Sequence, residues 1–110
     1  MKKLTIFIND QVADECDREM HLDQEQLKFL DQMDTDMDRG VKIQGELFAS
    51  PDTRQRATFI AMNLIKALQQ ENDAAKFASC AWLVKRLPGL VEMRASDQGN
   101  AVSIELVEEH

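Results

Sequence analysis

The chain has 110 residues, of which 44% are hydrophobic, 30% are charged and 5% are aromatic, and its formal net charge is −7. This length suits one core, so we expect residues 1–110 to form a single globular domain, and the apolar share is too ordinary for wholesale disorder. No stretch approaches the roughly 18 uncharged apolar residues that a membrane-spanning helix needs. The first ten residues are also too briefly apolar for a signal peptide, so we expect a cytoplasmic protein without a membrane partner.

Acidic residues are concentrated in one part of the chain. Residues 10–38 contain eleven Asp and Glu against two basic residues, whereas the remainder has eleven basic and nine acidic residues. The acidic stretch would repel a phosphate backbone, and no stripe of Lys and Arg with interleaved aromatics compensates, so we expect no direct nucleic-acid binding. It could instead face a basic protein partner, a divalent cation or only water.

The N-terminal third predicts a strand followed by a helix. Alternating apolar residues and β-branched types favour a strand over residues 3–9 with its Leu and Ile side chains inward. Asn9 or Asp10 would then cap a helix over 11–21. The apolar stripe of this helix consists of Val12, Ala13, Cys16 and Met20.

Two further helices have clear start signals. Asp23 with Gln26 three residues later forms a capping-box pattern, so a helix should begin at 23 and end at Gly40. Ser50 followed by Pro51 predicts the next helix, as a cap and a first helical position, and this helix should reach about residue 70. Residues 41–48 lack a helical period and predict a loop or a short extended segment.

The C-terminal third predicts a helix and a hairpin. Ten of the fourteen residues in 74–87 are apolar, which indicates a helix covered on most sides, ended by Pro88-Gly89, although one bent helix with the preceding segment is an alternative. Residues 91–95 and 102–106 alternate around a polar turn and predict a hairpin. The first strand should join this hairpin, because a two-stranded hairpin alone is marginal. The expected fold class is α+β, in the order β-α-α-α-α-β-β, with a small antiparallel or mixed three-stranded sheet and helices packed on one face.

Three aspartates are the candidate metal ligands. Asp31, Asp34 and Asp38 lie at i, i+3 and i+7, so their carboxylates share one helix face and could hold Mg²⁺ or Mn²⁺. A divalent-metal-dependent hydrolase of a phosphorylated small molecule would use these aspartates as metal ligands. Such an enzyme also needs a second acidic cluster on a facing helix. The same segment misses the glycine and glutamate positions of a calcium-binding EF-hand loop by one residue. The plainer interpretation is a solvated face, or a surface for a basic partner.

Other catalytic patterns are missing from the sequence. His21 and Cys16 lack the third group of a triad, no glycine-rich phosphate loop or nucleophile elbow occurs, and the ligands for a zinc site are too few. Cys16 and Cys80 both fit apolar stripes, so we expect them to be free, buried and unreactive. We therefore favour a protein without catalytic activity and without a cofactor, acting as a binding or accessory module.

The apolar surplus of such a small chain favours a homodimer. Trp82 lies on the nearly all-apolar helix and Phe59 points away from the stripe of its own helix, so both are candidate interface residues besides ordinary core. The predicted interaction surface comprises Asp31, Asp34, Asp38, Phe59 and Trp82. A third hypothesis is a small-molecule sensor with a pocket between the last helix and the sheet. Its predicted lining is Met33, Met37, Phe77 and Trp82.

Overall fold

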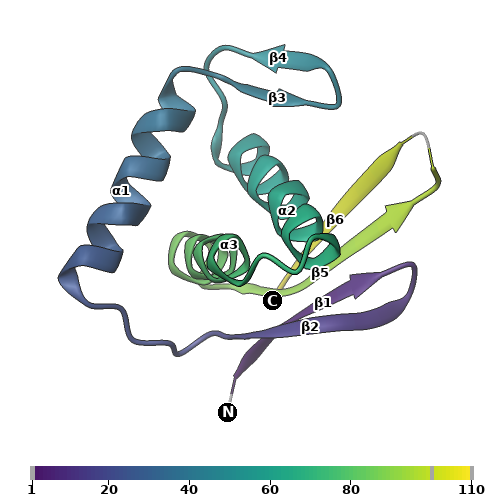
Figure 1. Ribbon diagram of the computed structural model, residues 1–110, viewed down its shortest axis with the longest axis horizontal. Helices are drawn as coiled ribbons and strands as arrows, with labels where there is room; N and C mark the ends of the chain where they lie inside the picture. The colour runs from purple at the N-terminus through teal and green to yellow at the C-terminus, as the bar shows by residue number, and fades with distance from the viewer. Residues whose placement is uncertain (1, 100, 110) are drawn as a thin grey trace.

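A mixed four-stranded sheet in the order β2-β1-β5-β6 forms the base of the molecule, as seen in a computed structural model that describes residues 2–99 and 101–109 (Figure 1). Strand β1 (Lys3–Ile8) pairs antiparallel with β2 (Gln11–Asp17) and parallel with β5 (Leu90–Asp97), which pairs antiparallel with β6 (Val102–Glu108). The α+β class and the pairing of the first strand with the C-terminal hairpin are confirmed. The sheet has four strands, however, where three were expected.

The predicted helix over residues 11–21 is wrong, because this segment contains strand β2. Asn9 and Asp10 both have positive φ angles, 51° and 67°, and form the two-residue turn of a β1–β2 hairpin where a helix cap was expected. Turns with two left-handed residues match the twist of paired strands, and Asn and Asp tolerate that conformation.

Helix α1 (Gln24–Asp38) begins and ends as predicted. The Asp23 carboxylate accepts a hydrogen bond from the backbone N–H of Gln26, and the Gln26 side chain accepts one from the backbone N–H of Asp23. Gly40 follows the helix with a φ of 106°, and a Cβ at this position would lie 3.2 Å from the carbonyl oxygen of Phe48. Residues 41–48 then take the extended alternative, as the hairpin of β3 (Val41–Ile43) and β4 (Glu46–Phe48).

Helices α2 (Thr53–Gln69) and α3 (Asp73–Arg86) are separate, so the alternative of one bent helix is wrong. The cap of α2 is Asp52, which forms a capping box with Gln55, rather than Ser50. At the end of α2, Glu71 has a φ of 54°, and the N–H of Asn72 donates to the carbonyl of Ala67 at 2.9 Å. This left-handed C-terminal motif turns the chain before Asn72 caps α3.

Helices α2 and α3 lie side by side on one face of the sheet, and α1 lies outside them at the edge of the molecule (Figure 1). The core between helices and sheet is apolar, and a bulge between Leu90 and Glu92 places Leu90 in it together with Met93 and Ala95. Its largest fully buried side chains are Trp82, Leu4, Ile6, Leu30, Leu64, Leu83, Leu90 and Met93. None of the helices in the described part of the chain has the length and apolar character needed to cross a bilayer.

Polar side chains make long-range contacts near both edge strands of the sheet. The Arg18 guanidinium donates to the Pro88 carbonyl at 2.8 Å and to the Glu109 carboxylate at 3.0 Å, which ties the end of β2 to the C-terminal strand. The hydrogen bond and the positive charge of Arg18 lower the pKa of Glu109 below its usual value. On the opposite edge, the Gln44 side-chain amide exchanges two hydrogen bonds with the backbone of Val102. The edge strand β6 therefore has part of its backbone covered at Val102, which limits pairing with other chains there.

Candidate functional site

The aspartates of α1 face arginines of the same chain. Asp34 accepts hydrogen bonds from Trp82 Nε1 at 2.8 Å and from Arg86 Nε at 3.0 Å, one on each carboxylate oxygen. The Arg86 guanidinium also donates to Asp31 at 2.9 Å. The cluster thus joins the middle of α1 to the last turns of α3.

A second arginine holds the end of α1. Arg56 on α2 forms an ion pair with the Asp38 carboxylate at 2.5 Å and donates to the backbone carbonyl of Asp34 at 3.1 Å. Its Nε also donates to the carbonyl of Pro51 at 3.2 Å, just before α2 begins. The three predicted aspartates therefore do share one face, and the structure shows that this face positions α1 against α2 and α3.

This arrangement gives the predicted metal site no support. Within the described residues, no three His, Cys, Asp or Glu side chains come together as a set that could hold a metal ion. Asp34 is occupied by Trp82 and Arg86, and the charges of Asp31 and Asp38 are each compensated by a guanidinium. The acidic second cluster that the hydrolase hypothesis needs is replaced here by arginines. Metal binding and capture of a basic partner stay predictions.

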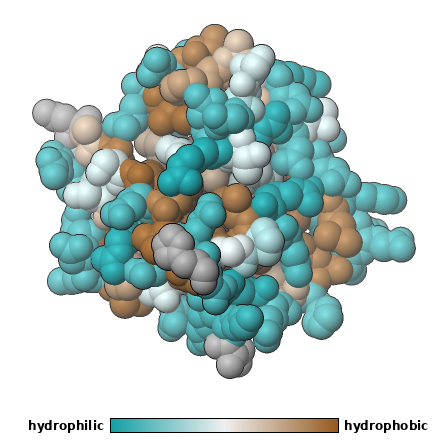
Figure 2. Space-filling view, turned by 180° about the vertical axis from the view of Figure 1, so that it is seen from behind, coloured by the Kyte–Doolittle hydropathy of each residue, from teal (hydrophilic) through white to brown (hydrophobic). Residues whose placement is uncertain are grey.

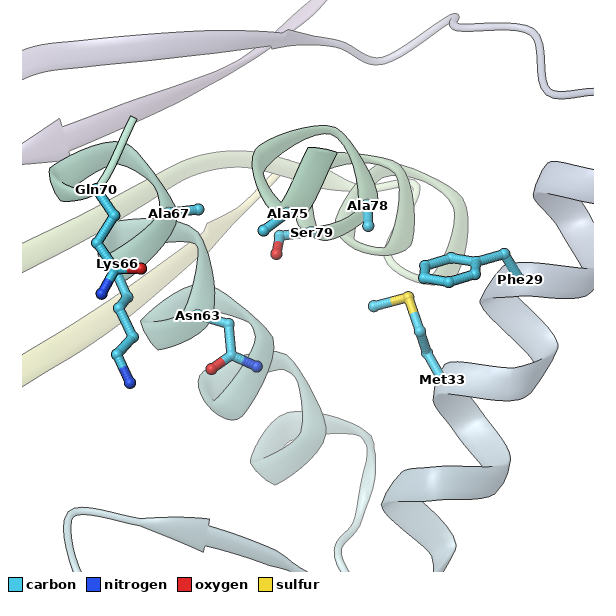
Figure 3. Close-up of a pocket in the computed structure, with 9 residues that line it drawn as sticks. All are labelled: Phe29, Met33, Asn63, Lys66, Ala67, Gln70, Ala75, Ala78 and Ser79. Carbon is cyan, nitrogen blue, oxygen red and sulfur yellow. The ribbon is translucent and has the colours of Figure 1, made fainter. Parts of the chain in front are cut away.

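A cavity of about 310 Å³ opens between the three helices (Figure 3). Phe29 and Met33 of α1 form one wall, and Asn63, Lys66 and Gln70 of α2 form the opposite wall. The floor consists of Ala67, Ala75, Ala78 and Ser79. An apolar wall and a polar wall thus face each other across a space in the size range of small-molecule sites.

A second cavity of about 250 Å³ lies next to the first, between α1 and α3. The two cavities share Phe29 and Ala78, and the second adds the apolar side chains of Leu30 and Phe77. Phe29 is 55% exposed and Phe77 is 45% exposed, which is unusual for phenylalanine in a folded domain. We call the two cavities together the α1 groove.

Charge is distributed unusually around the α1 groove. The chain has 20 acidic residues, yet no Asp or Glu is among the described residues that line either cavity. Among the described residues of these two linings, Lys66 is the one charged side chain. Lys66 also forms no ion pair with any side chain in residues 2–99 or 101–109.

Small residues of α3 create the space for the α1 groove. Ala74, Ala78 and Ala81 recur at helical spacing and face α1, where larger side chains would fill the gap. The composition of this helix predicted that it is apolar on most sides, but neither its small-residue stripe nor Phe29 was predicted as part of a site. The signal in the sequence is Phe29 itself, an aromatic residue one helical turn before Met33 on a helix with five acidic residues.

The predicted sensor pocket is only partly realised. Met33 and Phe77 line the α1 groove, but Met37 and Trp82 are buried, at 2% and 1% exposure. The pocket therefore lies among the three helices and not between the last helix and the sheet. Of the two predicted interface aromatics, Trp82 belongs to the core and Phe59 is partly buried against it.

The expectation that Cys16 and Cys80 are free is wrong. The structure joins them in a disulfide between β2 and α3, with a Cα–Cα distance of 5.9 Å, and both side chains are buried. Disulfides are rare in the cytosol, so this bond gives the predicted cytoplasmic location no support. His21 is exposed in the segment between β2 and α1.

The α1 groove is thus the feature that combines two adjoining cavities, exposed aromatic side chains and one charged side chain among its described lining residues. The arginine–aspartate cluster beside it is internally compensated. Comparison of the chain with protein-family models, with curated proteins and with solved structures finds no match.

Proposed function

We propose that this chain is a non-catalytic binding protein that holds a small, largely apolar molecule in the α1 groove. The observation that carries the proposal is the pair of adjoining cavities, with half-exposed Phe29 between them and a floor of alanines. Burial of apolar ligand surface against such a lining is favourable by roughly 25 cal/mol per Å². Few polar groups at one side suffice to orient a ligand.

The construction of α1 supports this function over the other hypotheses. The helix is fixed to α2 and α3 by Arg56 and Arg86, so the wall that carries Phe29 and Met33 is held in place before a ligand arrives. A pre-formed site loses less free energy in ordering on binding. The same contacts use the aspartates that a metal-dependent hydrolase would need free.

A homodimer through the groove is the competing use of these side chains. A second copy would bring another net charge of −7 against the first, and like charges oppose association. Figure 2 shows that hydrophobic residues on the face opposite to Figure 1 form separate groups between hydrophilic ones. The like charge of two copies favours a small occupant of the α1 groove over a second chain, and light scattering accompanies the test below.

Calorimetric titration with decanol tests the proposal, because this probe is neutral and apolar. We expect saturable binding at one site, and we expect Ala78→Leu to weaken it by about tenfold or more, since the added side chain occupies the floor shared by both cavities. Leucine is a good helix former, so α3 should persist.

The matched control is Gln69→Leu, which adds the same side chain at an exposed position of α2 outside both linings. It should bind decanol as the parent does. Absence of saturable decanol binding to a folded monomer would overturn the proposal, as would equal binding by Ala78→Leu. A dimer whose decanol binding rises on dilution would assign the groove to a second copy.

A further inference from the structure

We infer that the ligand of the α1 groove carries a single carboxylate, which lies beside Lys66 while its apolar body extends past Phe29 toward Phe77. This inference rests on the proposed function and adds the chemical class of the ligand. It joins three observations about the lining: the lone ammonium group, the exclusion of acidic residues and the separation of polar and apolar walls.

The charge of the lining selects an anion. Acidic residues make up 20 of the 110 positions, but none lines the two cavities among the described residues, so an anionic group in the groove meets no adjacent like charge there. Lys66 has no carboxylate partner in the described part of the chain. A bound carboxylate would supply that partner, and charge-assisted hydrogen bonds are stronger than neutral ones.

The polar wall fits one negative charge. Beside Lys66, the side chains of Asn63 and Gln70 lie on the same wall and offer neutral amide donors (Figure 3). A phosphate monoester would carry a charge of about −1.5 to −2 at neutral pH against one cation, whereas a carboxylate carries one charge. The head group predicted from this wall is therefore a carboxylate.

The apolar lining gives the direction of the ligand body. Phe29 and Met33 stand opposite the polar wall, and Phe29 also borders the second cavity. That second cavity continues between α1 and α3 with Leu30, Phe77 and alanines, and Gln26 is its one polar side chain. A molecule with its carboxylate at Lys66 thus finds apolar surface along its remaining length. An unbranched aliphatic acid meets this description.

Three probes with the same ten-carbon chain isolate the head group: decanoate, decanol and decyltrimethylammonium, each titrated calorimetrically below its micelle concentration. We expect decanoate to bind about three- to tenfold more tightly than decanol, as for a partly exposed charge-assisted contact, and decyltrimethylammonium to bind most weakly. Lys66→Gln should remove the advantage of decanoate over decanol and leave decanol binding unchanged.

Lys42→Gln is the matched control, because it removes the same charge from an exposed lysine of β3 outside both cavities. It should keep the preference for decanoate. Equal affinity for decanoate and decanol would overturn the carboxylate assignment while leaving the proposed function intact. A preference that survives Lys66→Gln would overturn the role of Lys66, and failure of all three probes would overturn the proposed function itself.

Discussion

Asp34 is a residue of α1 that forms hydrogen bonds with both neighbouring helices. Its two oxygens accept from Trp82 and Arg86, and its backbone carbonyl accepts from Arg56, so one residue of α1 contacts both neighbouring helices. Trp82 is 1% exposed, and its indole N–H donates to the Asp34 carboxylate at 2.8 Å. The carboxylate therefore satisfies a buried donor.

Replacing Asp34 with alanine should lower the free energy of unfolding by about 1–3 kcal/mol, because a buried donor is left without an acceptor. Asp34→Asn should cost less, since an amide oxygen can still accept from Trp82. Urea denaturation measures both. Asp36→Ala is the control on the same helix, where the side chain contacts exposed Gln32 alone among the described hydrogen-bonding partners. Equal losses for Asp34→Ala and Asp36→Ala would contradict the role assigned to Asp34.

At the scale of elements, the disulfide joins two segments that sequence reasoning did not place together. Cys16 on edge strand β2 and Cys80 on α3 are separated by 64 residues. A covalent link of that span restricts the unfolded chain strongly, and loop-closure entropy gives it a stabilisation of roughly 4 kcal/mol.

A variant with Cys16→Ala and Cys80→Ala should therefore unfold at a clearly lower denaturant concentration than the oxidised protein. The unfolding midpoint of the reduced parent should lie between those of the oxidised protein and the variant, or equal that of the variant. When the oxidised parent is alkylated in denaturant without reductant, mass spectrometry should find neither Cys16 nor Cys80 labelled. Labelling of both cysteines in protein purified without reductant would show that the bond does not form.

Strand β2 shows why the N-terminal third was predicted wrongly. Its inward position 14 is an aspartate, whose carboxylate lies 3.4 Å from the Lys76 ammonium of α3, so the period-two pattern of a strand is masked in the sequence. A register shift between Ile6 and Phe7 obscures it further. The apolar residues left over happened to fit a helical spacing. The inward position of Asp14 is explained by its partner Lys76 on α3, which lies far away in the sequence.

The bounds of helix α1 were predictable, because Asp23 with Gln26 and the break at Gly40 act within a few residues. The shared face of Asp31, Asp34 and Asp38 was predictable for the same reason. Their arginine partners were not, since Arg56 and Arg86 reach them from other helices. The α1 groove depends on the packing of three helices, so the alanines of α3 could indicate space but not its location.

At the scale of the whole molecule, the sheet, the helix pair α2–α3 and helix α1 form three layers. The sheet and the pair α2–α3 enclose an apolar core, to which α1 adds Leu30 and Met37. The arginine–aspartate cluster also joins α1 to α2 and α3, and the groove lies beside it. The Cα radius of gyration is 13.3 Å, close to the approximately 13 Å expected for a compact domain of this length. The groove is therefore a local opening in an otherwise ordinary packed domain.

The central claim is that the α1 groove binds a ligand, and methyl NMR tests it most directly. On addition of decanoate, the methyl signals of Ala74, Ala75, Ala78 and Ala81 should shift together with one saturation curve, while the methyl of Ala13 on β2 should not move. The predicted result is that the shifts are confined to these groove alanines. In the Ala78→Leu variant, the other three alanines should no longer shift. Unchanged groove alanines at saturating decanoate, or shifts spread evenly over the molecule, would contradict the account.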